Sequence, residues 1–406
     1  MTLNPDLEIG PDLEIGPDTA NGPDDLISPA RPHALAASAP PIFQSSSFLF
    51  ESYDQIADVF AGRSDRFIYS RGDNPTVSEL EGLIARLEQT EAARGFASGM
   101  AAICGAILPF VKSGDRVVAV RHLYSDAFRL CETVLKRFGI ETVYIDGRDT
   151  HALMEALPQA ALLYLESPTS WTFHEQDLAT LAAAARAAGT LSVIDNSWAT
   201  PLYQKPATLG IDLVVHAASK YLSGHSDTLG GLVAGSRELI TRIDHEATHL
   251  YGARMSPMDA FLILRGMRTL DLRMGRHMAS GLSLARKLAA HPAISAVHHP
   301  GLAPWAASAL AGYSGLFAFD LHEGIDVARF CNSLETIRIG VSWGGPESLI
   351  VPGEAACGLA GAANSFRRFG VSPRTIRLAV GLEPVETLEA DLLQALAASR
   401  QMEAAQ

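Results

Sequence analysis

Residues 211–227, IDLVVHAASKYLSGHSD, combine a strand pattern with a turn that contains a lysine. The first part, IDLVV, is a short β-branched run typical of a buried strand, and a polar turn containing glycine follows it. Lys220 therefore lies just beyond the carboxyl end of a strand, where a lysine can be partly desolvated. Desolvation favours the neutral amine, which can form a Schiff base, although this position alone is more often a solvated loop lysine.

Four similar runs precede this strand, and segments with helical content separate them. They are RVVAV at 116–120, ETVYI at 141–145, ALLYLE at 161–166 and LSVID at 191–195. The Ala-rich segment 177–189 is typical of a helix, and its final Gly189 suits the position after a helix end. Strands that alternate with helices predict a mainly parallel sheet covered on both faces, with ligands at the carboxyl ends of the strands.

The C-terminal part of the chain predicts a second, smaller α/β region. Residues from about 255 to 290 have apolar residues at helical spacing and predict one long helix. Segments 315–321 and 375–380 predict strands, and 385–400 predicts a closing helix.

Composition limits the classes of function. The chain has 406 residues, of which 48% are hydrophobic and 19% charged, as in an ordinary globular protein. The net charge of −13 argues against a nucleic-acid partner, because no basic stripe is left to neutralise phosphates. No apolar run reaches the roughly 18–20 residues that a membrane-spanning helix needs. We therefore expect a cytoplasmic protein with no membrane partner.

The N-terminal tail and the metal-ligating residue types carry little further information. Residues 1–30 hold the repeat PDLEIG twice, with seven acidic side chains and no Lys or Arg, and predict disorder. The four cysteines are far apart in sequence, so we expect free thiols and no metal site. The neighbouring His298 and His299 are expected in a surface loop before Pro300.

Two further segments acquire meaning beside Lys220. Asp195 ends the strand LSVID, and a buried acid there needs a partner such as a pyridinium nitrogen; a helix N-cap is the alternative. Ser98, Gly99 and Met100 open a helical run at 96–111, where free backbone N–H groups can hold a phosphate; an ordinary turn is the alternative. Together, in the order phosphate cradle, acid and lysine, they predict a pyridoxal-phosphate (PLP) site.

Seven ordered motifs resemble the cystathionine/methionine-metabolism family of fold-type I PLP enzymes. They are YSRGDNPT at 69–76, FASGMAA at 96–102, LESPTS at 165–170, VIDNSWATP at 193–201, AASKYLSGHSD at 217–227, SWGGPESL at 342–349 and IRLAVGLE at 376–383. The resemblance implies an α/β fold with a large, mainly parallel, seven-stranded sheet domain and a smaller C-terminal α/β domain.

The resemblance also implies a division of the chain into four parts. After the disordered acidic tail at 1–30, we expect an N-terminal arm at 31–70 that contacts a neighbouring subunit. A PLP-binding large domain would follow at 71–260, and a small domain at 261–406.

A set of cofactor contacts follows from the same resemblance. Lys220 would carry PLP covalently, and Asp195 would face the pyridine nitrogen. Tyr124 would stack on the ring, with a core or surface tyrosine as the alternative. The residues expected at the phosphate are Gly99, Met100 and Ser219 of the same chain and Tyr69 and Arg71 of a neighbouring subunit. The active site would then exist only in an oligomer, expected to be a homotetramer built as a dimer of dimers.

The substrate is expected to be a small sulfur amino acid. Arg377, in the strand TIRLAV, would clamp its α-carboxylate with a planar fork of N–H donors. The other residues expected to bind substrate are Ser342, Trp343 and Tyr124, and the residues expected to be catalytic are Lys220, Tyr124 and Tyr69.

Two positions favour one reaction within the family. Trp343 stands where many γ-acting relatives have leucine, and Ser170 stands where the family commonly has asparagine. Both resemble bacterial cystathionine β-lyases, which convert cystathionine and water to homocysteine, pyruvate and ammonia in transsulfuration and methionine biosynthesis. Side activity on cysteine or cystine is expected. The alternatives are a cystathionine γ-lyase or γ-synthase, an O-acylhomoserine sulfhydrylase and, in a different class, a non-catalytic regulatory protein with this fold.

Overall fold

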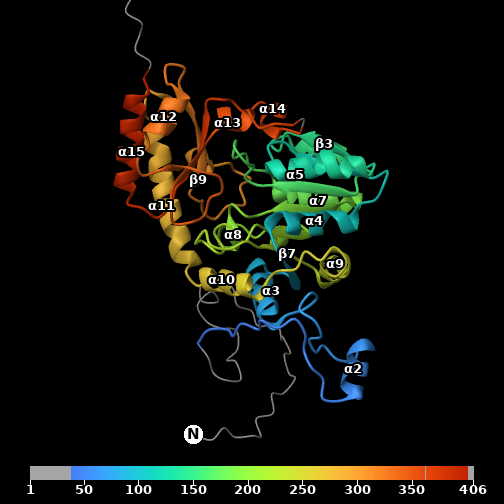
Figure 1. The fold of residues 1–406 in the computed structure, drawn as a ribbon. Helices are drawn as coiled ribbons and strands as arrows, with labels where there is room; N and C mark the ends of the chain where they lie inside the picture. The colour runs from blue at the N-terminus through green and yellow to red at the C-terminus, as the bar shows by residue number, and fades with distance from the viewer. Residues whose placement is uncertain (1–37, 362, 401–406) are drawn as a thin grey trace, which may run out of the picture.

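Two β-sheets, each with its own helices, make up the structure (Figure 1). This computed structural model describes residues 38–361 and 363–400, so the tail expected at 1–30 lies outside the described residues. The seven-stranded sheet has the order β1-β7-β6-β5-β4-β2-β3, and the five-stranded sheet has the order β10-β11-β12-β9-β8. A larger mixed sheet and a smaller C-terminal sheet are the architecture that the sequence predicts.

The large sheet contains all five strands that the hydrophobic runs predict, and two more. Its strands are β1 (Ala92–Phe96), β2 (Arg116–Val120), β3 (Glu141–Ile145), β4 (Leu162–Glu166), β5 (Leu191–Asp195), β6 (Leu213–His216) and β7 (Gly231–Gly235). Strand β7 is antiparallel to both of its neighbours, and the remaining pairs are parallel. Strands β1 and β7 escape prediction because AARGF contains a charged residue and GLVAG begins and ends with glycine.

Helices cover both faces of this sheet. Leu232 and Ala234 of β7 share an apolar cluster with helices α3 (Pro75–Glu88) and α10 (Pro257–Met267). Val233, which lies between them and points to the opposite face, belongs to a cluster with α4 (Gly99–Ile107). Because both faces are buried, the strands are nearly continuous hydrophobic runs, and β4 is buried at every position.

Three helices, among them the long helix and the C-terminal helix, cover one face of the small sheet (Figure 1). Its strands are β8 (Ile294–His298), β9 (Leu316–Leu321), β10 (Arg338–Ile339), β11 (Leu349–Pro352) and β12 (Thr375–Ala379). Helices α11 (Leu270–Ala289), α12 (Val327–Ser333) and α15 (Val385–Ala398) contribute Leu284, Phe330 and Leu392 to its apolar cluster. Strand β9 and the closing helix lie where the sequence predicts them.

The prediction of one long helix over residues 255–290 is wrong, because α10 ends at Met267 and α11 begins at Leu270. The carbonyl of Gly266 accepts hydrogen bonds from the Arg273 guanidinium (2.7 Å) and the Thr269 hydroxyl (3.1 Å), which replace the continuing helical bond. The helical pattern continues across the break, so periodicity alone could not reveal it.

The prediction that His298 and His299 lie in a surface loop is also wrong. His298 is the last residue of β8 and its ring lies 2.8 Å from a carboxylate oxygen of Asp320, while His299 is 5% exposed. Pairing with β9 continues the strand through His298, so the expected surface loop is absent at these residues.

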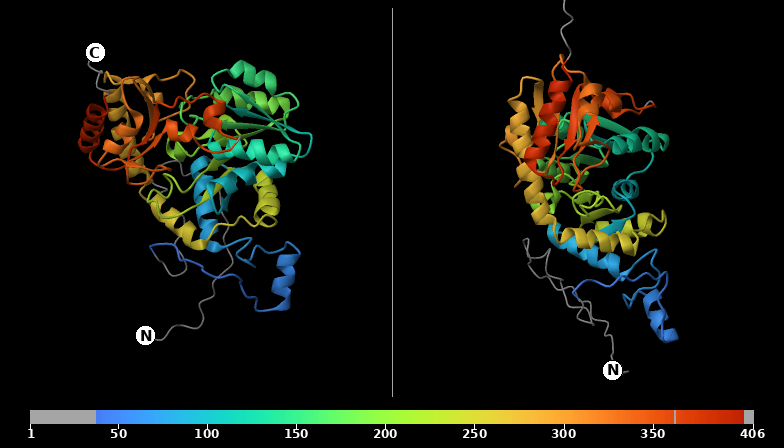
Figure 2. Two further views of the ribbon diagram at one scale, coloured as in Figure 1. Left: turned by 45° about the horizontal axis from the view of Figure 1, so that its top comes forward. Right: turned by 60° about the vertical axis from the view of Figure 1, so that its left-hand side comes forward.

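The remaining elements connect the sheets or extend from them. They are α2 (Tyr53–Phe60), α5 (Ser125–Arg129), α6 (Thr150–Ala156), α7 (Leu178–Ala188), α8 (Thr200–Tyr203), α9 (Arg237–Ile243), α13 (Gly353–Cys357) and α14 (Ser365–Arg368), the 3-10 turns η1 (Leu108–Phe110), η3 (Pro206–Leu209) and η5 (Pro300–Leu302), and the π turns η2 (Leu130–Leu135) and η4 (Asp244–Thr248). Helix α2 buries none of its residues and stands away from both sheets (Figure 2). Among the described helices, none is long and apolar enough to cross a membrane.

Candidate active site

The carboxyl ends of the central strands bring two acids and a lysine to one edge of the large sheet. Strand β4 ends at Glu166 and β5 ends at Asp195, and the parallel register places these two residues side by side. Strand β6 ends at His216, and Lys220 follows it in the next turn. This edge is where ligands bind in parallel α/β sheets, as the sequence predicts.

The Lys220 side chain contacts two residues from the C-terminal part of the chain. Its Nζ donates a hydrogen bond to Ser342 Oγ (2.6 Å) and lies 5.4 Å from the centre of the Trp343 ring. Burial, followed by the positive charge of Arg377, lowers the pKa of the Lys220 amine to about 8, although Asp195 opposes this shift. A neutral amine is therefore accessible close to neutral pH, and it is the form that attacks an aldehyde.

A glycine lets the Ser342 loop approach Lys220. Gly344 has φ +90°, and a Cβ there would lie 2.7 Å from the Tyr221 nitrogen and 2.9 Å from the Lys220 carbonyl carbon. The Trp343 ring packs against Tyr221 with 5.2 Å between centroids. Close backbone contact thus sets the position of both Ser342 and Trp343 beside the lysine.

Asp195 keeps one carboxylate oxygen free of hydrogen bonds from the described residues. Its Oδ1 accepts bonds from the Ser197 amide (3.0 Å) and hydroxyl (2.5 Å), and the Ser197 hydroxyl accepts from the Ala217 amide (2.6 Å). Asp195 is not a helix N-cap, because α8 begins after Ala199. Burial raises the pKa of Asp195, against the two bonds from Ser197. Its free oxygen, Oδ2, suits a protonated ring nitrogen.

Glu166 is a site residue that the sequence interpretation missed. Its Oε2 accepts the Tyr124 amide (2.6 Å), and its Oε1 accepts the amide (2.8 Å) and hydroxyl (2.6 Å) of Ser170. Burial, and then the charge of Asp195, raises its pKa to about 8. It therefore ties together the turns that follow β2 and β4. The signal was present, since ALLYLE ends in an acid just as LSVID does.

Tyr124 lies near Asp195 and Arg377 and remains protonated. It is 38% exposed at the start of α5, and its hydroxyl donates to Asp126 (2.9 Å). Burial raises its pKa above the usual value, and the charges of Asp126 and Asp195 act in the same direction. The phenol therefore keeps its proton over the pH range in which proteins are stable.

Arg377 reaches the same region from strand β12 of the small sheet. Its guanidinium has no hydrogen bond or ion pair with the described residues, and its Cζ lies 5.3 Å from the centre of the Trp171 ring. Burial lowers its pKa to about 10, against the nearby Tyr124 and Glu166. A partly buried guanidinium without an acid partner is unfavourable unless an anion binds to it. Arg377 can therefore receive a substrate carboxylate.

The start of helix α4 forms the opposite end of the site. Helix α4 begins at Gly99 after the cap residue Ser98, whose hydroxyl accepts the Ala101 amide (3.1 Å). A Cβ at Gly99 would lie 2.8 Å from Ala217 Cβ, so this helix end lies against the segment leading to Lys220. The first-turn amides of Gly99 and Met100 have no helical acceptor and can bind a phosphate.

Ser219 lies in the same segment but already has partners. Its hydroxyl accepts the Gly230 amide (3.0 Å) and donates to the Gly230 carbonyl (3.3 Å). Ser219 thus lies two residues beyond Ala217, which contacts the start of α4, and its hydroxyl would need to turn to reach a phosphate bound there.

Tyr69 and Arg71 are not brought to Lys220 within one chain. Tyr69 pairs with Ser47 in an isolated β-bridge, and Arg71 donates to the His249 carbonyl (2.5 Å). Both residues are exposed. Their expected role in the site of a neighbouring subunit stays a prediction.

Other site types lack support in the part of the chain that the structure describes. Residues 38–361 and 363–400 contain no group of three or more His, Cys, Asp or Glu side chains that could hold a metal ion. The four cysteines are free thiols.

The comparisons with known proteins agree on a family. A model of the Cys/Met metabolism PLP-dependent enzymes matches residues 27–397, and the chain belongs to that family. It is 39% identical over 371 residues to an L-methionine gamma-lyase of Pseudomonas putida, covering 89% of this chain and 93% of the relative. It is 36% identical to a cystathionine gamma-lyase of Bacillus subtilis, covering 89% and 94%.

A solved structure supports the same assignment. The cystathionine gamma-lyase of Lactobacillus plantarum, complexed with L-serine, superposes with a TM-score of 0.86 at 33% identity, covering 93% of this chain and 98% of that one. The family and the fold predicted from the seven motifs are confirmed, and PLP is the family's cofactor. The residues present fit it: a lysine with a lowered pKa, an acid with a free oxygen, and a helix start with unpaired amides.

Proposed function

We propose that this member of the Cys/Met metabolism family is a PLP-dependent γ-lyase that cleaves the Cγ–S bond of L-methionine or cystathionine. The observation that carries the proposal is the 39% identity to an L-methionine gamma-lyase over 89% of this chain. These relatives favour the γ-lyase alternative over the cystathionine β-lyase that Trp343 and Ser170 suggested. For methionine, water and substrate would give 2-oxobutyrate, ammonia and methanethiol.

Lys220 would hold and move protons in this reaction. When bound, PLP withdraws electrons from the substrate Cα and so makes the protons at Cα and Cβ removable. γ-Elimination needs both protons to leave, and a base must reach both carbons. The Lys220 amine, with its pKa lowered to about 8, is suited to accept the proton that leaves each of these two carbons in turn.

Arg377 would orient the substrate. Its guanidinium has no acid partner among the described residues, so a bidentate contact with the α-carboxylate would satisfy it. The Ser342 hydroxyl accepts a hydrogen bond from the Lys220 amine (2.6 Å). When that amine binds the cofactor, the hydroxyl would be free to donate a hydrogen bond to the substrate carboxylate.

Tyr124 would protonate the departing sulfur. Its phenol carries a proton, which the hydroxyl donates to Asp126 (2.9 Å) and would turn toward the departing thiolate. The Tyr124 amide donates a hydrogen bond to Glu166, and this bond fixes the backbone from which the Tyr124 ring projects.

The phosphate would be shared between subunits. Gly99, Met100 and Ser219 would bind it from the same chain, and Tyr69 and Arg71 from a neighbouring subunit of a homotetramer. Their exposure in the single chain supports this arrangement.

Cystathionine β-lyase is the second candidate, and one structural feature favours it. Two indoles flank the reacting groups: Trp343 lies 5.4 Å from Lys220 Nζ, and Trp171 lies 5.3 Å from Arg377 Cζ. Such bulk near the carboxylate site restricts the path of the distal substrate chain.

The products separate the candidates directly. The purified holoenzyme is incubated with L-methionine and, separately, with L-cystathionine, and the keto acid and thiol are identified. 2-Oxobutyrate with methanethiol or cysteine supports the γ-lyase. Pyruvate with homocysteine overturns it in favour of the β-lyase. Slow turnover of both thioethers with rapid replacement on an O-acylhomoserine would indicate a sulfhydrylase or γ-synthase. Lys220→Ala is the inactive control.

A further inference from the structure

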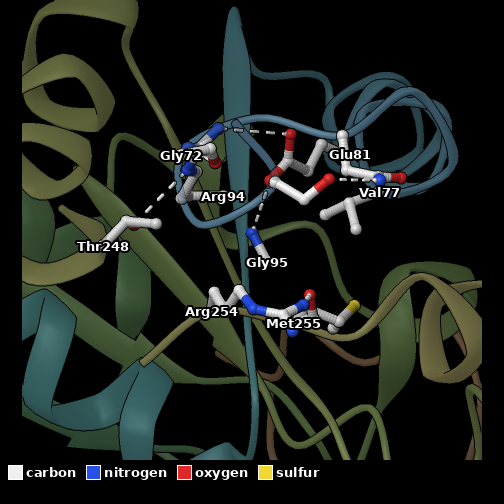
Figure 3. Close-up of a pocket in the computed structure, with 10 residues that line it drawn as sticks. Gly72, Val77, Glu81, Arg94, Gly95, Thr248, Arg254 and Met255 are labelled. Atoms are coloured by element: carbon white, nitrogen blue, oxygen red, sulfur yellow. Dashed lines mark hydrogen bonds and ion pairs between the residues drawn. The ribbon is translucent and has the colours of Figure 1, made fainter. Parts of the chain in front are cut away.

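A charged cluster centred on the buried Arg94 lies beneath the turn that carries Tyr69 and Arg71. It consists of Arg94 with Asp73, Glu81 and Asp244, and we call it the Arg94 cluster. Arg94 projects from strand β1, is 7% exposed and lies between Glu81 and Thr248 (Figure 3). An arginine inside a sheet of apolar strands needs such partners.

One guanidinium joins three elements of the chain. Arg94 Nη1 lies 2.7 Å from Asp73 Oδ1 and 3.6 Å from Glu81 Oε2 in α3, and Nη2 lies 2.5 Å from Asp244 Oδ1 in η4. The same group also donates to the Gly72 carbonyl and, through Nε, to Thr248 Oγ1 (3.3 Å). Arg94 therefore fastens the Gly72–Asp73 turn to both α3 and η4.

The charges of the cluster depend on Arg94. Burial raises the pKa of Glu81 and of Asp244, and in both cases Arg94 is the largest opposing influence. Burial also opposes the charge on Arg94, but Glu81, Asp244 and Asp73 outweigh it and raise its pKa. Without Arg94, three carboxyl groups would face one another, and the turn would separate from η4.

The turn is held on the other side by the residue after η4. Arg71 donates to the His249 carbonyl, and a Cβ at Gly72 would lie 2.6 Å from His249 Nε2. Tyr69 and Arg71 are nevertheless exposed, because the contacts of the cluster are made by their neighbours Gly72 and Asp73. The cluster thus supports the turn from inside and leaves both side chains exposed.

We propose that Arg94 is a positioning residue that holds the Tyr69–Asp73 turn in the shape required to reach the cofactor phosphate of a neighbouring subunit. The inference rests on the shared phosphate site of the proposed function. It has a consequence that an ordinary structural role lacks: substitution of Arg94 weakens cofactor binding in the adjacent subunit and spares the site of its own chain.

Cofactor retention by single variants is the first measurement. Arg94→Met holoenzyme is dialysed, PLP remaining on Lys220 is fixed with borohydride, and the label is counted. We expect PLP affinity to fall about tenfold or more. Asp73→Asn, which removes one partner and leaves Arg94 paired, should show a smaller loss in the same direction. Lys287→Met, which breaks a remote ion pair with Glu389, should retain PLP normally. Unchanged retention in both cluster variants would overturn the proposal.

Mixed oligomers then test whether Arg94 acts across the interface. Tagged Arg94→Met chains are reassembled with Lys220→Ala chains, so only the tagged chain can be labelled. Its partner supplies an intact turn, and the label on the tagged chain should rise above the level in the Arg94→Met oligomer. Label that stays at that lower level would overturn the proposal. Asp73→Asn chains give the same test if Arg94→Met does not fold.

A parallel mixture separates the two proposals. Arg71→Ala chains reassembled with Lys220→Ala chains test the shared phosphate site itself. Recovery of label on the Arg71→Ala chain without recovery on the Arg94→Met chain would reject the role of Arg94 and leave the shared site standing. Failure of recovery in both mixtures would reject the shared site and, with it, the inference.

Discussion

The guanidinium of Arg377 lies over the indole of Trp171, with Cζ 5.3 Å from the ring centroid. Trp171 is 5% exposed, has φ +67° and is backed by the Phe366 ring at 5.1 Å. A ring face attracts the positive charge without occupying its N–H groups. Arg377 is therefore fixed in place while its donors remain available for a carboxylate.

Replacement of Trp171 should affect substrate binding more than turnover. Loss of a partly desolvated cation–π contact removes about 1–2 kcal/mol, so Trp171→Leu should raise KM for an amino-acid substrate roughly 5- to 30-fold. Trp171→Phe keeps a ring face and should lie between this variant and the native enzyme. Steady-state kinetics with the preferred thioether provide the measurement. A fall in kcat with unchanged KM would contradict the role.

Replacement of Arg377 should reduce substrate binding more than replacement of Trp171. Arg377→Met removes the charge that would bind the α-carboxylate, and loss of charged hydrogen bonds costs about 2–3 kcal/mol, or roughly a hundredfold in kcat/KM. Arg377→Lys keeps the charge without the planar fork and should lose less. Both variants should still load PLP, as measured by visible absorbance. Near-normal kcat/KM for Arg377→Met would show that the carboxylate binds elsewhere.

The rate of cofactor loading should depend on pH through Lys220. Only the neutral amine attacks the aldehyde, and its pKa is lowered to about 8. PLP should therefore join the apoenzyme slowly below that pH, and the rate should rise through it to a plateau. Stopped-flow absorbance at a series of pH values measures the midpoint. A midpoint near the ordinary lysine pKa would contradict the burial of this amine.

Two variants should move this midpoint in opposite directions. The positive charge of Arg377 disfavours the ammonium form, so Arg377→Met should raise the midpoint. The negative charge of Asp195 favours the ammonium form, so Asp195→Asn should lower it. Shifts of the same sign in both variants would show that these charges do not act on Lys220.

Gly99 should tolerate no side chain. A Cβ there would meet Ala217 Cβ at 2.8 Å, so Gly99→Ala should displace the start of α4 and reduce PLP affinity. Ala217→Gly in the same chain should restore part of it by removing the opposing atom. Gly275→Ala is the matched control, because nothing lies within 4 Å of its Cβ position in α11. Equilibrium dialysis of PLP measures all three, and equal affinities would contradict the contact.

Local patterns were sufficient to predict the central strands and the meeting of Asp195 and Lys220. LSVID and IDLVV are β-branched runs whose strand character does not depend on distant contacts, and parallel neighbours end at one edge of a sheet. Glu166 was within reach of the same argument. Its neighbour in register is Asp195, and both acids end such runs.

The features that sequence could not predict depend on contacts between distant segments. Arg94 in AARGF does not look like a strand residue until Asp73, Glu81 and Asp244 surround it. The break between α10 and α11 arises because Arg273 binds the Gly266 carbonyl, which a helical repeat does not reveal. The reaction assignment rested on two side chains near the site, and the curated relatives favour the γ-lyase alternative.

Reduction of the holoenzyme with borohydride, followed by peptide mapping, identifies the lysine that carries PLP. Because a Schiff base at the Lys220 amine is fixed by reduction, we expect one PLP-modified peptide, which contains Lys220 and disappears in Lys220→Ala. A stable PLP adduct on a different lysine, or an unmodified Lys220 in an active preparation, would contradict the account.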